Sequence, residues 1–179
     1  ADVIDAVLDG GAKFASEILQ PINAIGDKQG CKRNPDGSVT TPKGFREAYQ
    51  QMSDDGWMAI SADQEWGGQG LPRVISMPFL EMCSSANMAF SMYPGLTRGA
   101  AEAIQTGGSD EQKKTYLTNM MTGKWSGTMN LTEPQCGTDL GLIRTKAVPQ
   151  PDGSYKITGQ KIWISGGEQD LAPNIIQLV

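Results

Sequence analysis

The character of the sequence changes along the segment WSGTMNLTEPQCGTD, which spans residues 125–139. Before this segment, apolar residues recur at every third or fourth position, which is typical of amphipathic helices. Its first seven residues favour a β-strand, and a short loop with hydroxyl groups, a proline and a glycine follows directly. The change of period predicts two domains, a helical domain over residues 1–124 and a β-rich, incomplete domain over residues 125–179.

The first part of the helical domain contains two predicted helices. The first carries an apolar stripe and is expected to end near Pro21, because proline removes a backbone hydrogen bond inside a helix. Residues 26–44 are rich in polar residues and helix breakers, and we expect a long surface loop there. Thr41, followed by a proline, is expected to cap the second helix. That helix should bury four side chains: Phe45, Ala48, Tyr49 and Met52.

A second group of helices follows from Pro72 onward. Apolar residues keep helical spacing up to Phe90, and the run Tyr93-Pro94-Gly95 is expected to break the helix before another helical run. Ser109 and Gln112 form a capping-box pattern at the start of the last helix, which should stop at Gly123.

Three strands are predicted in the β-rich domain, over residues 125–131, 155–165 and 174–179, with a turn at residues 151–153. The last strand is apolar and has no following partner, so we expect the chain to be a fragment of a longer protein.

Composition excludes several classes of function. The 179 residues carry 15 basic and 20 acidic side chains, without a basic stripe that could bind nucleic-acid phosphates. There is no histidine, which argues against Ser-His or Cys-His hydrolases. The three cysteines are far apart, so neither a disulfide framework nor a metal site is predicted. No apolar run approaches the length of a transmembrane helix, and a reducing, cytoplasmic location is expected.

The loop after residue 131 is the first candidate for chemistry. Pro134 stiffens the exit from the strand, Gly137 lets the backbone approach a ligand, and Thr132 and Thr138 can bond to ligand oxygens. An ordinary polar turn is the alternative that composition alone favours. Cys136 is better explained as a packing residue than as a nucleophile. We expect Glu133 to be a structural hydrogen-bond acceptor and not a catalytic base.

The second candidate lies within the predicted strand of residues 155–165. Strand alternation would place Trp163 and Ser165 on one face, where the indole could stack on a planar heteroaromatic cofactor while the hydroxyl bonds to a ring nitrogen. A core tryptophan in a β-sandwich is the alternative.

Together these two segments resemble the acyl-CoA dehydrogenase family, whose signature is Thr-Glu-Pro, two variable positions and Gly-Ser-Asp. Glu65-Trp66-Gly67-Gly68-Gln69-Gly70 is similar to a further family loop, Tyr-Gly-Gly-Gln-Gly, so the resemblance covers nearly the whole chain. It is greatest to the larger bacterial members, including those that act on 3-methylthiopropanoyl-CoA or on fatty acyl-CoA. The chain departs from the signature at Thr138, which replaces serine, and at Gln135-Cys136, which replace a small pair.

The resemblance implies an α+β fold: an all-helical N-terminal domain, then the start of a β-barrel or sandwich middle domain, with the family's C-terminal helical domain absent. It implies an FAD-dependent oxidoreductase of fatty acid metabolism that converts an acyl-CoA to the 2-enoyl-CoA. An electron-transfer flavoprotein is the implied acceptor, and a homo-oligomer is the implied assembly. The catalytic base is expected after Val179, so the chain alone should be inactive. The residues implied to bind FAD are Met129, Asn130, Leu131, Thr132, Thr138, Trp163, Ile164 and Ser165. Thr138 is also implied to contact the acyl-CoA.

Three alternatives remain open at this point. An acyl-CoA oxidase or a flavin monooxygenase of the same fold would surround the flavin in a similar way. A non-catalytic helical interaction module would instead use the methionines of the helical domain as a partner surface, although methionines at helical spacing usually belong to a core: Met77, Met82, Met88 and Met92.

Overall fold

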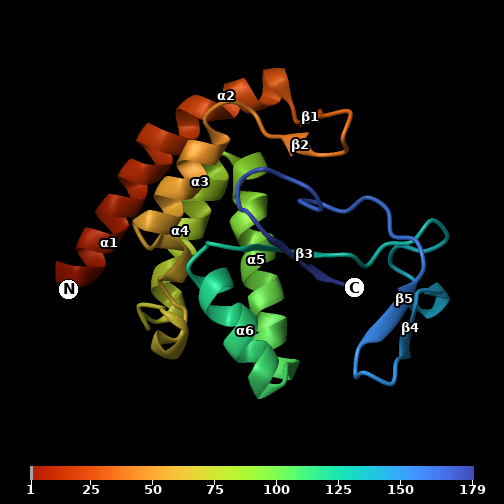
Figure 1. Cartoon of the computed structure of the whole chain (residues 1–179). Coiled ribbons are helices and arrows are strands. Elements are labelled where there is room, and N and C mark those ends of the chain that lie inside the picture. The colour runs from red at the N-terminus through yellow and green to blue at the C-terminus, as the bar shows by residue number, and fades with distance from the viewer. Residues whose placement is uncertain (1) are drawn as a thin grey trace.

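A computed structural model describes residues 2–179. It confirms a helical domain followed by short β-elements (Figure 1). The helices are α1 (Asp2–Lys13), α2 (Gln20–Gln29), α3 (Phe45–Asp54), α4 (Arg73–Ala86), α5 (Met88–Gly107) and α6 (Asp110–Met121), with a π-helical turn at Phe14–Leu19 and three short 3₁₀ turns at Trp57–Ala59, Gln64–Trp66 and Leu140–Leu142. The strands are β1 (Lys32–Arg33), β2 (Val39–Thr40), β3 (Ser126–Met129), β4 (Lys146–Pro149), β5 (Tyr155–Thr158) and β6 (Ile175–Leu178).

The first helix does not end at Pro21, so that prediction was wrong. The π-helical turn joins α1 to α2 without a break, and Pro21 lies in the first turn of α2. A proline costs little there, because its missing N–H falls where helical hydrogen bonding is already reorganised. The predicted loop of residues 26–44 is therefore shorter, since α2 reaches Gln29 and β1 pairs with β2 in an antiparallel hairpin.

The helix caps also differ in part from the prediction. Gly44, with φ 91°, precedes α3, and the Thr41 hydroxyl donates to Asp170 Oδ1 at 2.6 Å instead of capping the helix. Helix α5 runs through Pro94, and the chain breaks earlier, at Asn87, whose side chain accepts from Phe90 N at 3.0 Å. The buried amide of Asn87 also donates to Leu19 O at 3.3 Å, which ties the start of α5 to the π-helical turn between α1 and α2.

Two clusters of buried side chains hold the helical domain together. The larger one contains the four residues predicted for α3, and in it Phe45 meets Phe90 edge-on with ring centroids 5.7 Å apart. The smaller one lies between α5 and α6, around Leu117 and Met120. Most of the methionines that helical spacing placed in the core lie on the surface. Met82 is half-buried, whereas Met77, Met88 and Met92 are exposed.

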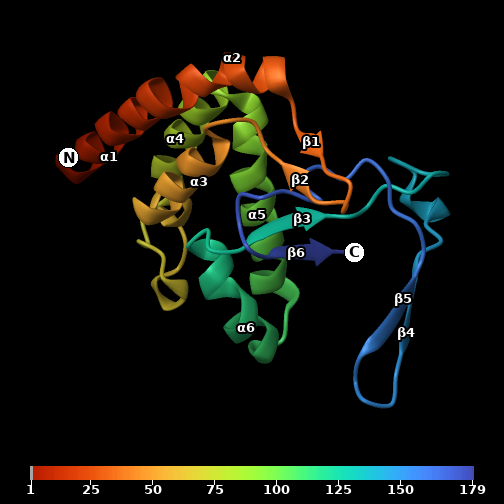
Figure 2. The same ribbon diagram turned by 45° about the horizontal axis from the view of Figure 1, so that its top comes forward.

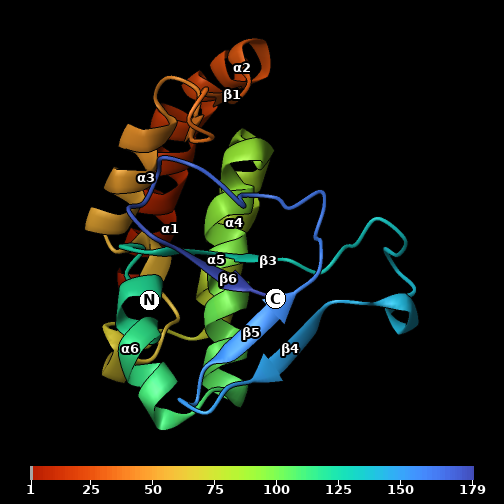
Figure 3. The same cartoon turned by 45° about the vertical axis from the view of Figure 1, so that its right-hand side comes forward.

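Strand β3 lies across α5, and β6 pairs with β3 in parallel (Figures 2 and 3). A Cβ at Gly127 would come 2.7 Å from Ala100 Cβ and 2.8 Å from Met120 Cε, so the absence of a side chain lets strand and helix approach closely. The β4–β5 hairpin extends away from the helices (Figures 1 and 2), and all residues of its two strands are exposed. The strand predicted over residues 155–165 was wrong beyond Thr158.

The predicted capping box of α6 is confirmed. Ser109 Oγ accepts from Gln112 N at 3.2 Å, and Gln112 Oε1 accepts from Ser109 N at 2.8 Å. Replacing Ser109 with alanine is expected to destabilise α6 by about 1 kcal/mol, because one N-terminal N–H loses its acceptor. Hydrogen exchange of the α6 amides would measure this, with Thr115→Ala on the same helix as the control. Unchanged exchange in Ser109→Ala would contradict the prediction.

Candidate functional site

The structure brings the two candidate segments together. Ile162 N donates to Thr132 O at 3.0 Å, and Lys161 Nζ donates to Leu131 O at 3.0 Å. Within β3 itself, the hydroxyl of Thr128, which is fully buried, donates to Ser165 O at 2.6 Å. The loop after β3 and the segment around Trp163 therefore form one continuous surface at the end of β3.

Glu133 lies beneath this surface as a structural acceptor, which confirms the prediction made for it. Its carboxylate is buried and accepts from Arg144 N at 2.8 Å, Thr145 N at 3.0 Å and Lys161 Nζ at 2.9 Å. The Thr145 hydroxyl, the Arg144 N–H and the Lys161 ammonium hold the pKa of Glu133 far below its ordinary value of 4.5, although burial acts in the opposite direction. A carboxylate with such a low proton affinity is a poor general base.

This depressed pKa predicts how stability depends on pH. The stabilisation from the Glu133 carboxylate is fully present above the unfolded-state pKa near 4.5 and is lost as the pH falls toward the lower folded-state value. We therefore expect the stability difference between wild type and Glu133→Gln to be constant near neutral pH and to shrink below about pH 4.5. Chemical denaturation at a series of pH values measures it. A difference that stays constant through the acid range would contradict the prediction.

The end of β3 presents the first four residues implied for flavin binding. Met129 is 50% exposed and Leu131 is 38% exposed, while Asn130 and Thr132 are half-buried. Asn130 Nδ2 donates to Gln177 Oε1 at 2.8 Å, but Asn130 Oδ1 is buried and has no hydrogen-bond partner within residues 2–179. An unpaired buried acceptor is costly, so this atom is suited to a donor from a ligand.

Trp163, Ile164 and Ser165 do not form the expected strand. Trp163 has φ 57°, a left-handed conformation that is uncommon for residues other than glycine, so the strand alternation that would put Trp163 and Ser165 on one face does not apply. The Trp163 side chain is 86% exposed, which also excludes the core tryptophan alternative within the described chain. Ile164 is half-buried and Ser165 is exposed.

Thr138 lies farther along the loop and is exposed. No hydrogen bond within the described part of the chain links its side chain to the segment around Trp163. Cys136 is buried, and its backbone exchanges two hydrogen bonds with that of Glu133, at 2.9 and 3.0 Å. This burial agrees with a packing role for the thiol. No local sequence pattern indicates the roles of Lys161 and Thr128, because their partners lie 28 and 37 residues away.

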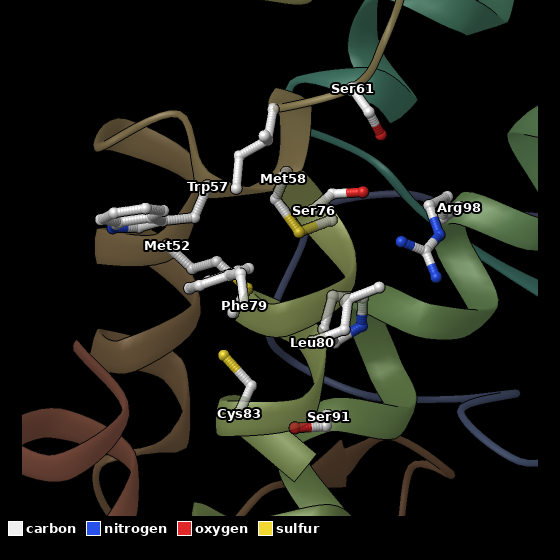
Figure 4. Close-up of a pocket in the computed structure, with 12 residues that line it drawn as sticks. Met52, Trp57, Met58, Ser61, Ser76, Phe79, Leu80, Cys83, Ser91 and Arg98 are labelled. Atoms are coloured by element: carbon white, nitrogen blue, oxygen red, sulfur yellow. The ribbon is translucent and has the colours of Figure 1, made fainter. Parts of the chain in front are cut away.

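A second hollow region lies between α4 and α5. A partly open cavity of about 30 Å³, lined mostly by apolar side chains such as Met58 and Phe79, is large enough for a single water (Figure 4). Next to it is an outer groove of about 220 Å³, which shares Ser61, Ser76 and Arg98 with the cavity. Met77, Gly95 and Gly99 also line the groove, and so does the exposed ion pair of Arg73 and Glu102. A Cβ at either glycine would meet open space.

Comparison with known proteins identifies the family. Residues 6–124 match the family model for the acyl-CoA dehydrogenase N-terminal domain. The chain belongs to the acyl-CoA dehydrogenase family. It is 48% identical over 174 residues to the 3-methylmercaptopropionyl-CoA dehydrogenase of Ruegeria pomeroyi, which covers 97% of this chain and 29% of that protein. It is 41% identical over 181 residues to a butyryl-CoA dehydrogenase of Syntrophomonas wolfei, covering 99% of this chain and 30% of that protein. The chain thus spans less than a third of the length of these acyl-CoA dehydrogenases.

The fold agrees with this family. A crystal structure of an acyl-CoA dehydrogenase complexed with FAD, from Bacillus anthracis, superposes with a TM-score of 0.75 at 24% identity, over 92% of this chain and 26% of that one.

Within residues 2–179, no helix is long and apolar enough to cross a membrane. The same residues contain no cluster of three or more acidic, histidine or cysteine side chains that could hold a metal ion.

Proposed function

We propose that the protein carrying this chain is an FAD-dependent acyl-CoA dehydrogenase, which oxidises the α,β bond of an acyl-CoA thioester to the 2-enoyl-CoA. One observation carries the proposal: the hydrogen bonds from Ile162 to Thr132 and from Thr128 to Ser165 join the two signature segments into one surface. In this proposal that surface is one face of the flavin site.

The side chains of this surface fit a flavin. Trp163 offers a large exposed indole that can lie against a planar ring system. The buried, unpaired Asn130 Oδ1 suits the N–H on the pyrimidine side of the isoalloxazine, where Thr132 can also bond. Ser165 supplies a free hydroxyl for a ring nitrogen. Aromatic stacking together with acceptors and donors at the ring edge is the combination that a flavin requires.

The residues of this chain have binding and orienting roles in the proposed reaction. When bound, FAD accepts the hydride that leaves the β-carbon of the acyl group. Thr132, Trp163 and Ser165 hold the ring in place, and Thr138 contacts the acyl-CoA, a role assigned to it by resemblance to the family. Glu133 does not remove the α-proton, because its carboxylate is already neutralised by Lys161. We assign that step, by resemblance, to a glutamate after Val179, and electron acceptance to an electron-transfer flavoprotein.

The groove between α4 and α5 is the proposed position of the acyl chain. Gly95 and Gly99 leave open space along α5, and the flexible thioether of Met77, 59% exposed, can adapt to chains of different shape. Relatives named for 3-methylmercaptopropionyl-CoA and butyryl-CoA point to a short acyl group. A short acyl chain also suits a groove of about 220 Å³.

Replacing Trp163 with alanine is expected to weaken FAD binding roughly tenfold to a hundredfold, because an aromatic contact with a heterocycle contributes about 1–3 kcal/mol. Titration of the apoprotein with FAD, followed by quenching of flavin fluorescence, measures the affinity. Trp163→Phe is the matched control and should keep most of the affinity, since it retains an aromatic face. Equal affinities for wild type and Trp163→Ala would refute the stacking role.

Anaerobic titration of the full-length natural protein with butanoyl-CoA and 3-methylthiopropanoyl-CoA tests the function. We expect the oxidised flavin band to bleach and an artificial electron acceptor to restore it. Rapid reoxidation by oxygen, with stoichiometric peroxide, would instead indicate an acyl-CoA oxidase, and oxygen insertion into a substrate would indicate a monooxygenase. A protein that binds no flavin would favour the interaction module, with the exposed Met88 and Met92 as part of its surface.

A further inference from the structure

The Glu133 carboxylate joins three separate segments of the chain. One oxygen accepts from Arg144 N and from Gln135 Nε2, the latter at 2.5 Å, and the other accepts from Thr145 N and Lys161 Nζ. The side chain of Glu133 is only 2% exposed and that of Lys161 is 12% exposed. This is therefore a buried ion pair with additional hydrogen bonds, in contrast to the exposed pair of Arg73 and Glu102.

Lys161 extends the connection to the proposed flavin surface. Besides Glu133, its ammonium bonds to Leu131 O at 3.0 Å, and the next residue, Ile162, bonds to Thr132 O. Thr132 is thus held between two anchored neighbours, Leu131 and Glu133. The same anchors fix the backbone two residues before Trp163.

The side chains that would face the flavin are not fixed by contacts of their own. Trp163 is 86% exposed, and Ser165 and Thr138 are exposed as well. The left-handed backbone of Trp163 is unfavourable for a residue with a side chain, and such a conformation persists only when its surroundings impose it. The bonds at Lys161, Ile162 and Ser165 are the contacts that impose it here.

We propose that Glu133 and Lys161 are positioning residues for the flavin site. They do not touch the flavin; their buried ion pair sets the separation and the relative orientation of Thr132 and Trp163, which do. This inference rests on the proposed function. If one partner is removed, the other is left as an uncompensated buried charge, and the two segments lose their common anchor.

The test compares Glu133→Gln, Lys161→Met, Lys161→Arg and the Glu133→Gln/Lys161→Met double variant in the full-length natural protein. The measured quantities are FAD affinity and the visible circular dichroism of bound flavin, recorded well below each variant's unfolding temperature. We expect each of the first two variants to weaken FAD binding about tenfold or more and to change the dichroism, because a small displacement of binding groups has a large effect. Lys161→Arg should keep most of the wild-type FAD affinity, because arginine is also a cation that can pair with Glu133. The FAD affinity of the double variant should fall by a much smaller factor than the product of the factors for the two single variants, since both substitutions act through one contact.

Asp170→Asn is the matched control. Asp170 is also a structural carboxylate that accepts two bonds, from the N and Oγ1 of Thr41, but it lies outside the flavin surface. This variant should lower the unfolding temperature and leave both flavin measurements unchanged.

The results separate the two proposals. If wild type binds FAD and the folded Glu133→Gln and Lys161→Met variants bind it equally well with unchanged dichroism, the positioning role is overturned and the proposed function stands. If wild type binds no FAD, both are overturned. If Glu133→Gln does not fold, Lys161→Met decides, because it leaves three donors on the Glu133 carboxylate.

Discussion

Replacing Phe90 with alanine is expected to destabilise the helical domain by about 3–5 kcal/mol, the largest effect that we predict for a single side chain. Phe90 has no exposed surface and packs edge-on against Phe45, in the first turn of α5. Alanine would leave a cavity there that the surrounding rings and the Asn87 cap are too rigid to fill. Hydrogen exchange of the α5 amides in the natural protein reports the local free energy of opening.

Met88→Ala is the control for this substitution. Met88 lies two residues earlier in the same helix but is 61% exposed, so its loss should change the opening free energy by less than about 0.5 kcal/mol. Similar effects of the two substitutions would contradict the assignment of Phe90 to the core and of Met88 to the surface.

Replacing Gly127 with valine is expected to cost about 3 kcal/mol and to weaken FAD binding as well. Even a single Cβ would meet Ala100 and Met120 below 3 Å, and the two methyl groups of valine add to this overlap. Strand β3 must then move away from α5, breaking the bond from Gly127 N to Thr97 Oγ1, 3.1 Å long. Because β3 leads directly into Thr132, this displacement also moves the proposed flavin surface.

Thermal unfolding and FAD titration of Gly127→Val measure the two effects. Gly107→Ala is the control, because a Cβ at Gly107, the last residue of α5, meets no atom within 4 Å. Alanine also restricts the unfolded chain more than glycine does, so this control should be neutral or slightly stabilising. Wild-type stability in Gly127→Val would show that β3 does not lie directly on α5.

Much of the fold could be predicted from the sequence where the determinants are local. Helical spacing identified the buried face of α3, and the pair Ser109 and Gln112 identified the start of α6. Two of the errors fell at prolines. Pro21 and Pro94 lie inside continuous helical stretches, because a π-helical turn accommodates the first and tertiary packing holds the second. Local propensity contains neither of these effects.

The two segments of the candidate site could be singled out from the sequence, but their geometry could not. The loop after β3 and the segment at Trp163 were both identified, and Glu133 was correctly interpreted as a structural acceptor. The left-handed backbone at Trp163 and the role of Lys161 were not predictable, because both depend on partners about thirty residues away. The exposure of Met77 was missed because helical spacing does not show which face of a helix is covered.

The parallel pairing of β3 with β6 has a consequence for the order of folding. The two strands are separated by all of residues 130–174, so their ladder can form only after that long loop has closed, at a large entropic cost. In contrast, β3 meets α5 and α6 through neighbouring parts of the chain. On a ribosome, the helices and β3 can therefore pack while β6 is still being synthesised. The helical domain then acts as the template to which β6, and with it the segment of Trp163, is added after β3.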